Sequence, residues 1–174
     1  MFFMESKMEL FFRISELLNS LGIVPMLFGS MGLEHRLNVD LNVQDLDVSI
    51  LKSDFIKNKY KIRKLMLDSG YELLQESNMS LTFYIDGIEV EFYYFDKDEC
   101  GNILIDVKSL SDIAVLSLNG VEVFHKGSVS YMLPSLPDYL KIYTAFSKSL
   151  IRKQMGKCDK DLQKIRLIQE ALNS

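Results

Sequence analysis

The stretch that decides the fold reads Leu27-Phe28-Gly29-Ser30 and, after a gap of 14 residues, Asp45-Leu46-Asp47-Val48. An apolar run leads into Gly29, and the residues after Ser30 have room for one or two helical turns. This order predicts a strand, a tight turn and a helix. Gly29 lets the backbone approach a phosphate closely, Ser30 adds a hydroxyl donor, and the amide groups of a helix start point towards an anion. The same sequence also fits an ordinary strand-to-helix turn capped by Ser30.

The second half of this stretch predicts a strand with one acidic face. Over residues 44–51, Asp45 and Asp47 alternate with apolar residues. Both carboxylates therefore project from one face, with their Cα atoms about 6.5–7 Å apart. Mg²⁺ prefers oxygen ligands and usually keeps waters and phosphates in its shell, so two or three carboxylates are enough to hold it. A solvated edge strand carries the same pattern.

A third carboxylate is expected from the run 88–92, where Glu89 and Glu91 share one face and apolar residues fill the other. If this strand lies beside the strand of Asp45 and Asp47, either glutamate can reach the same cation. The wet side of an antiparallel strand is the alternative explanation for the pattern.

Apolar residues spaced three and four apart predict the helices. We expect helices at 9–21, 55–69 and 139–152, and a last one beyond Gly156. The apolar stripe of that last helix consists of Leu162, Ile165, Ile168 and Leu172. Ser135 and Pro137 have the positions of a cap and a first-turn proline for the helix at 139–152.

Runs rich in β-formers predict strands at 71–75, 81–85 and 88–95, with Asp86-Gly87 as a hairpin turn between the last two. A second hairpin is expected where the runs 114–118 and 121–124 flank Asn119-Gly120. The predicted fold class is α/β (α+β), with a mixed β-sheet, flanking helices and a C-terminal helical hairpin. We expect one compact unit, in which residues 1–135 form the core and residues 136–174 a helical extension packed on it.

Composition limits the class of protein. The 174 residues are 48% hydrophobic and 25% charged, which suits one globular domain with its own core and excludes a fibrous or disordered chain. Two distant cysteines form no zinc or redox motif. The start lacks the pattern of a signal peptide, and no apolar run reaches 18 residues, so we expect a cytoplasmic protein without a membrane span.

Charge is unevenly distributed along the chain. The net charge is -4, yet residues 141–174 carry eight Lys and Arg against three acidic residues. A basic tail beside an acidic body suits a polyanionic ligand such as a nucleoside triphosphate or RNA. Solvated outer faces of two helices explain the same charges.

The motifs together resemble the signature of the DNA polymerase β-like nucleotidyltransferase superfamily. That signature is an apolar residue, Gly, then Gly or Ser, and after a gap an acid–apolar–acid strand, with a third carboxylate on a later strand. A gap of 14 residues resembles the AbiEii-like toxin branch and the small single-domain branches. Residues 138–145 and 156–162 look like the Lys-bearing helix and the Lys-Asp-Leu segment of those branches, so the resemblance spans roughly residues 20–170.

The resemblance implies a role for each matching residue. Gly29 and Ser30 would contact the triphosphate, and Lys141 the nucleotide, with Asp161 as a helper. Mg²⁺ or Mn²⁺ would be held by Asp45, Asp47 and Glu91, which are the implied catalytic residues, with Glu89 as the alternate to Glu91.

The implied reaction is attack of an acceptor hydroxyl on the α-phosphorus of a nucleoside triphosphate. The acceptor is a small molecule, an RNA end or a protein side chain. One alternative is a nucleotide-binding protein that has lost turnover, as a component of a toxin–antitoxin pair. A metal-dependent phosphohydrolase is less favoured because the His-rich motifs of many such enzymes are absent. The apolar residues Phe2, Phe3, Phe11 and Phe12 either pack inward or form a homodimer contact.

Overall fold

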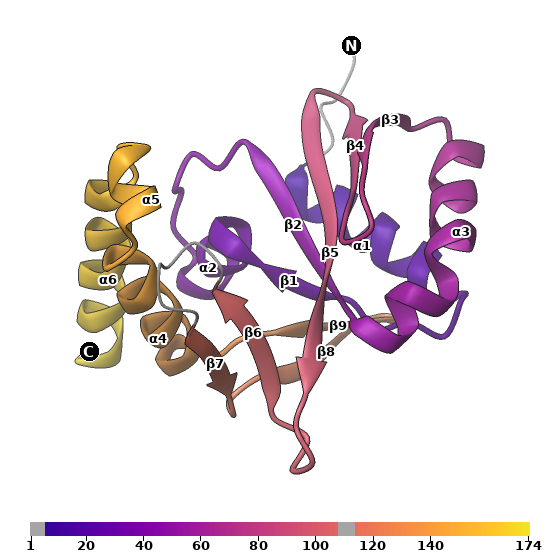
Figure 1. The fold of residues 1–174 in the computed structure, drawn as a ribbon. Coiled ribbons are helices and arrows are strands. Elements are labelled where there is room, and N and C mark those ends of the chain that lie inside the picture. The colour runs from indigo at the N-terminus through magenta and orange to yellow at the C-terminus, as the bar shows by residue number, and fades with distance from the viewer. Residues whose placement is uncertain (1–5, 108–113) are drawn as a thin grey trace.

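The structure of the protein is a computed structural model that describes residues 6–107 and 114–174. Within these ranges, a mixed sheet lies between two groups of helices (Figure 1). The helices are α1 (Lys7–Asn19), α2 (Gly29–Leu37), α3 (Lys52–Asp68), α4 (Leu136–Ser147), α5 (Leu150–Gln154) and α6 (Cys158–Leu172). The strands are β1 (Met26–Phe28), β2 (Asp45–Leu51), β3 (Glu72–Glu76), β4 (Leu81–Ile85), β5 (Ile88–Lys97), β6 (Ile103–Val107), β7 (Ala114–Leu118), β8 (Glu122–Lys126) and β9 (Val129–Leu133).

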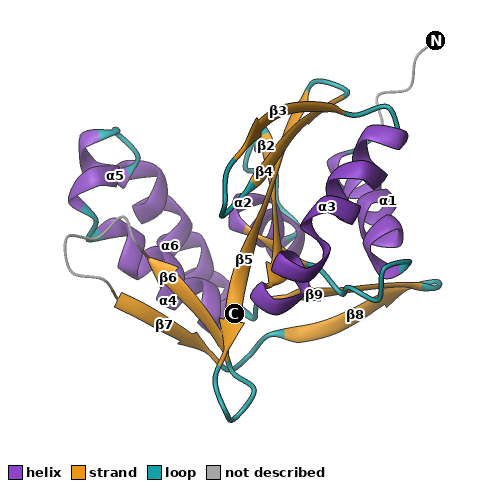
Figure 2. Ribbon diagram, turned by 45° about the vertical axis from the view of Figure 1, so that its right-hand side comes forward, coloured by secondary structure: helices purple, strands orange, loops and turns teal. Residues whose placement is uncertain are grey.

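The sheet runs in the order β3-β4-β5-β2-β1-β9-β8, and β6 and β7 extend it from the end of β5. The central strand β2 is antiparallel to β1 and parallel to β5. Strand β5 is shared, because its first part pairs with β2 and β4 while Asp96 and Lys97 pair with β6. Figure 2 shows β6 and β7 turning away from the main sheet towards α4 and α6. The mixed sheet and the C-terminal helices confirm the predicted fold class.

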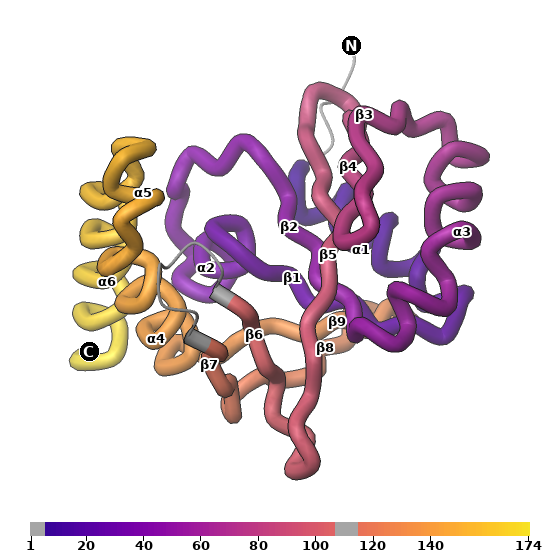
Figure 3. Tube along the Cα trace, in the orientation of Figure 1, coloured from indigo at the N-terminus to yellow at the C-terminus, as the bar shows by residue number. Residues whose placement is uncertain are grey.

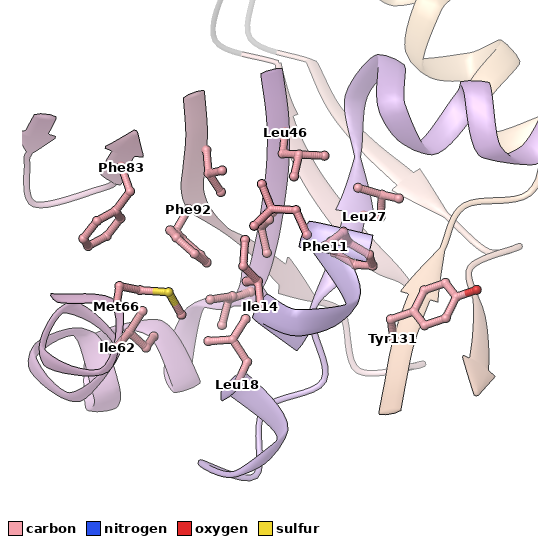
Figure 4. Packing of buried hydrophobic residues seen from close by; sticks show 14 of the residues in the cluster. Phe11, Ile14, Leu18, Leu27, Leu46, Ile62, Met66, Phe83, Phe92 and Tyr131 are labelled. Carbon is pink, nitrogen blue, oxygen red and sulfur yellow. The ribbon is translucent and has the colours of Figure 1, made fainter. Parts of the chain in front are cut away.

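One face of the sheet packs against α1 and α3. Helix α1 begins with a capping box, in which Ser6 and Glu9 satisfy each other's backbone N–H groups. Its apolar stripe then enters a core that also receives side chains from β2, β4, β5 and α3, as Figure 4 shows. The side chains labelled there are Phe11, Ile14, Leu18, Leu27, Leu46, Ile62, Met66, Phe83, Phe92 and Tyr131. This core fixes β2 and β5 side by side.

The other face carries a second apolar cluster, which joins the C-terminal helices to the sheet. Tyr139, Ile142 and Ile168 pack there with Met26 and Phe28 of β1. Along the tube in Figure 3, the chain from α4 to its C-terminus stays on this side of the sheet. Helices α4 to α6 therefore lie on the side of the sheet opposite α1 and α3.

Of the two hairpin turns that the sequence predicts, one is correct and one is wrong. Asp86-Gly87 closes the β4–β5 hairpin, where Ile85 pairs with Ile88, as predicted. The hairpin predicted at Asn119-Gly120 is wrong, because β7 pairs with β6 and β8 pairs with β9. Gly120 donates its N–H to the Asp138 carboxylate and accepts from the Ser135 N–H, so the start of α4 takes up the backbone groups that a hairpin needs.

The C-terminal helices differ from the prediction in one respect. The helix expected over 139–152 is two helices, because α4 ends at Ser147 and Ser149 caps α5 by accepting from the Arg152 N–H. Ser135 caps α4 with Pro137 in its first turn, as predicted. Strands β6 and β9 were not predicted.

Two of the four phenylalanines near the N-terminus lie within the described residues. Phe11 is buried, and Phe12 packs against the first core, so both point inward. Phe2 and Phe3 lie outside the described residues. No helix in the described part of the chain is both long and apolar enough to cross a bilayer.

Candidate nucleotide and metal site

A cleft of about 1350 Å³ lies between the central strands and the C-terminal helices. One wall comes from the α2 turn and from β2 and β5, and the other from α4, α5 and α6. The Gly29-Ser30 turn lies in this cleft, as do Asp45, Asp47 and Glu91. The residues that the sequence singled out around its first motif are thus brought to one place.

The acidic wall follows from strand alternation. In β2 the apolar residues Leu46 and Val48 are fully buried in the first core, so Asp45 and Asp47 must point to the opposite, cleft-side face. The parallel pairing of β2 and β5 then places Asp47 beside Glu91 and Asp45 beside Glu89. Four carboxylates consequently form one patch, and both candidate third acids adjoin the aspartate pair.

Burial and repulsion between neighbouring carboxylates raise the pKa values of Asp47 and Glu91. Burial, together with the negative charges of Asp45 and Glu91, raises the pKa of Asp47 from 3.8 to about 7, against the opposing effect of Lys157 and Lys164. The pKa of Glu91 is raised by burial and by Glu89 and Asp45. Loss of hydration and, after it, repulsion between the carboxylates therefore both disfavour the negative charge in this patch.

Gly29 makes this arrangement sterically possible. Its φ is +64°, and a Cβ at this position would lie 2.2 Å from Oδ2 of Asp47. The Asp47 carboxylate is thus packed directly against the backbone of the turn, where no other residue fits. Helix α2 begins here at Gly29 without a side-chain cap, which corrects the reading of Ser30 as an ordinary helix cap and leaves the first amides of the helix for a ligand.

Ser30 is joined to the basic wall. Lys164 on α6 donates from its Nζ to Ser30 Oγ at 2.7 Å. The Tyr143 hydroxyl lies 3.4 Å from the same Oγ, and the Lys164 Nζ lies 4.8 Å from the centroid of the Tyr143 ring. Burial lowers the pKa of Lys164, while Asp161 opposes that change.

Helices α5 and α6 supply further cations. Arg152, Lys157 and Lys160 line the cleft together with Lys164. Asp161 is fully buried and accepts two hydrogen bonds of 2.7 Å from Arg152, so this carboxylate fixes α5 against α6. The cleft is therefore acidic on the strand side and basic on the helix side.

The structure does not bring Lys141 to this cleft. Its Nζ lies near Ser117 O, Asn119 Oδ1 and Asp138 Oδ1, where it holds the segment between β7 and β8 against α4. Lys164 is the residue that sequence reasoning missed. The signal available in the sequence was the spacing of Lys157, Lys160 and Lys164 on one helix, but helix periodicity alone does not say which face meets the cleft.

The donor set fits a hard divalent cation. The described residues include no group of three or more His, Cys, Asp or Glu already placed to hold a metal ion. The acidic patch nevertheless offers oxygen ligands only, as Mg²⁺ and Mn²⁺ prefer, and its excess negative charge is what such a cation would offset.

Comparison with known proteins gives a fold. No family model matches the chain. The uncharacterized protein YnaI of Bacillus subtilis (strain 168) is 27% identical over 168 residues, which cover 94% of this chain and 96% of YnaI. The lincosamide antibiotic adenylyltransferase LnuA, in its lincomycin-bound crystal structure, superposes with a TM-score of 0.62 at 12% identity, over 94% of this chain and 96% of LnuA.

A second solved structure is ANT(2″)-Ia in complex with adenylyl-2″-tobramycin. It superposes with a TM-score of 0.60 at 9% identity, over 94% of this chain and 87% of that one. Both likenesses extend over nearly the whole chain, including the C-terminal helices. The protein therefore has the nucleotidyltransferase fold.

Proposed function

We propose that the protein is a metal-dependent nucleotidyltransferase, which moves a nucleoside monophosphate from a nucleoside triphosphate to an acceptor hydroxyl. One observation carries this proposal: a single cleft places the carboxylates of Asp45, Asp47 and Glu91 against the Gly29-Ser30 turn, with Lys164 opposite. This is the combination of anion-binding and cation-binding groups that a metal–triphosphate complex needs.

The chain's own residues have distinct parts in this mechanism. The free amides at the start of α2, the Ser30 hydroxyl and the Lys164 ammonium group bind the triphosphate. Bound Mg²⁺ or Mn²⁺, held by Asp45, Asp47 and Glu91, would supply charge neutralisation and orientation of the phosphates. Lys164 takes the role that the sequence resemblance gave to Lys141.

The acceptor proton needs a base. Glu91 has two alternative roles: it either completes the metal site or accepts this proton as the acceptor oxygen bonds to the α-phosphorus and the bond to pyrophosphate breaks. Glu89 is the alternate for this third carboxylate. Burial, followed by the charges of Glu89 and Asp45, raises the pKa of Glu91 and so makes its carboxylate a stronger base than an exposed glutamate. Pyrophosphate leaves towards Lys164 and Lys157, which line the basic side of the cleft.

A small molecule is the acceptor that we propose. The cleft of about 1350 Å³ has room for a nucleotide and a second small ligand. The solved structures of LnuA and ANT(2″)-Ia contain lincomycin and an adenylylated tobramycin, respectively. Neither of these structures supports the AbiEii-like branch or a toxin–antitoxin role, so we propose neither for this protein.

The test is calorimetric titration with each of the four ribonucleoside triphosphates, with and without Mg²⁺. We expect Mg²⁺-dependent binding that the Asp45→Asn/Asp47→Asn variant loses. The Asp68→Asn/Asp86→Asn variant is the matched control. It also removes two aspartate charges, but at exposed sites that do not line the cleft. Equal affinity in the wild type and the Asp45/Asp47 variant would contradict the proposed site.

Turnover is then measured as pyrophosphate release with lincomycin or tobramycin as the first acceptors, using the triphosphate that binds. Acceptor-dependent release supports the transferase. Metal-dependent binding without release for these and a wider set of hydroxyl compounds would favour the binding protein that has lost turnover.

A further inference from the structure

The Ser30 hydroxyl lies at the centre of a small network that the reaction scheme does not explain. Lys164 from α6 and Tyr143 from α4 both approach its Oγ, although the two helices are far from Ser30 in sequence. Tyr143 is only 2% exposed, although it lines the cleft. The network thus connects three elements at the expected position of the triphosphate.

Only one of the two contacts has a fixed direction. An ammonium group has no acceptor, so Lys164 must donate to Ser30. The Tyr143 hydroxyl lies 3.4 Å from Ser30 Oγ, and either oxygen can be the donor. With neighbours on two sides, the Ser30 hydroxyl is restricted in the directions in which it can point.

Tyr143 is itself held rigidly. Its ring stacks on that of Tyr139, with centroids 6.3 Å apart and an angle of 19° between the planes. The Tyr139 hydroxyl donates to the Leu27 carbonyl of β1, next to the phosphate turn. Phe146 contacts the other part of the Tyr143 ring edge-on. The position of the Tyr143 hydroxyl is therefore set by the packing of α4 against β1.

We propose that Tyr143 is a positioning residue for triphosphate binding. Its hydroxyl restricts the orientation of the Ser30 hydroxyl beside a phosphate oxygen, and its ring face supports the Lys164 ammonium group beside the same phosphate. Tyr143 need not touch the nucleotide for this role, since it acts through Ser30 and Lys164. The inference rests on the proposed function and adds to it a residue that no sequence motif marks.

A double-mutant cycle tests this inference. The probe is tripolyphosphate with Mg²⁺, because it reports phosphate contacts without any contribution from the base. Tyr143→Phe keeps the ring and removes only the hydroxyl. We expect it to weaken binding of the probe by about 2–10-fold in the wild-type background, the range of one hydrogen bond, and to have no further effect in the Ser30→Ala background.

Two further variants separate positioning from structure. Tyr131→Phe is the matched control: it removes the hydroxyl of another largely buried tyrosine, which lies on β9 outside the cleft lining, and should leave the dissociation constant unchanged within twofold. Tyr143→Leu removes the ring as well, and should weaken binding more than Tyr143→Phe, because Lys164 then loses its aromatic support. Thermal unfolding of each variant confirms that it is folded at the temperature of the titration.

The outcomes are distinct. Equal losses from Tyr143→Phe with and without Ser30, or no loss in the wild-type background, would overturn the inference while leaving the proposed function intact. Binding of a nucleoside triphosphate without binding of the tripolyphosphate probe would also overturn it. If the wild type binds neither ligand, the proposed function fails together with the inference.

Discussion

Asp47 holds its carboxylate in surroundings that disfavour the charge. It is packed against the backbone of Gly29, and Asp45 and Glu91 stand on either side of it. The alternation of Asp45 and Asp47 with buried apolar residues was enough to predict that both face one way. The sequence does not show the close approach to Gly29, which arises only when β1 and β2 pair.

A stability difference follows from the raised pKa of Asp47. In the folded state this pKa is about 7 and in the unfolded chain about 3.8, so the folded state binds the proton more tightly. The contribution of Asp47 to stability is therefore full below about pH 3.8 and is lost as the pH rises through about 7. We expect Asp47→Asn to stabilise the metal-free protein at both pH values, and to do so more at pH 8 than at pH 5.

The measurement is thermal unfolding in EDTA at both pH values. The gain at pH 8 should be at least about 1 kcal/mol, or roughly 2–4 °C in Tm for a chain of this length. Added Mg²⁺ should stabilise the wild type but not the variant. A variant that is less stable than the wild type at pH 8 in EDTA would contradict the inference that ionised Asp47 destabilises the metal-free protein.

At the scale of elements, local signals predicted the helices and strands better than the partners that the strands choose. Asn119-Gly120 has the sequence of a hairpin turn, yet Ser135 and Asp138 at the start of α4 bind the backbone of Gly120. These two hydrogen bonds come from residues 15 and 18 positions further along the chain, which no local sequence pattern contains. The same limit explains why Lys164 rather than Lys141 reaches the cleft, because the packing of α4 against α6 decides which lysine points inward.

The junction of α5 and α6 depends on one buried ion pair. Asp161 is fully buried and meets Arg152 with two hydrogen bonds. Asp161→Leu leaves the Arg152 charge unpaired, and we expect it to lower the free energy of unfolding by about 3 kcal/mol. Urea denaturation measures this loss.

Two variants check the cause of that loss. Arg152→Met/Asp161→Leu should recover most of the stability, since no charge is then left unpaired. Lys160 is the exposed neighbour of Asp161, and Lys160→Ala should change the free energy of unfolding by less than about 0.5 kcal/mol. A double variant as unstable as Asp161→Leu alone would show that packing, and not the unpaired charge, is responsible.

For the whole molecule, the two apolar clusters determine how the chain unfolds. The predicted division into a core at 1–135 and an extension at 136–174 follows the sequence, but the second cluster mixes residues from both segments. Met26 and Phe28 are covered by Tyr139, Ile142 and Ile168. The first cluster lies entirely within residues 1–135, but the C-terminal helices bury their apolar face only together with β1 and its neighbours.

We therefore expect one cooperative unfolding transition for the full chain. Differential scanning calorimetry should give equal calorimetric and van't Hoff enthalpies, and tyrosine fluorescence should follow the same curve as circular dichroism. Two resolved transitions would instead indicate that the C-terminal helices unfold separately from the sheet.

The sharing of strand β5 separates two properties of the cleft. Its first part fixes Glu91 beside Asp47, whereas only the pairs Asp96–Leu104 and Lys97–Ile103 join it to β6. Leu104 and Ile105 of β6 also line the cleft. Strands β6 and β7 can therefore change without altering the register that holds Glu91 beside Asp47. For the transferase proposed above, this makes acceptor selectivity and the chemistry at the acidic patch separately adjustable parts of one chain.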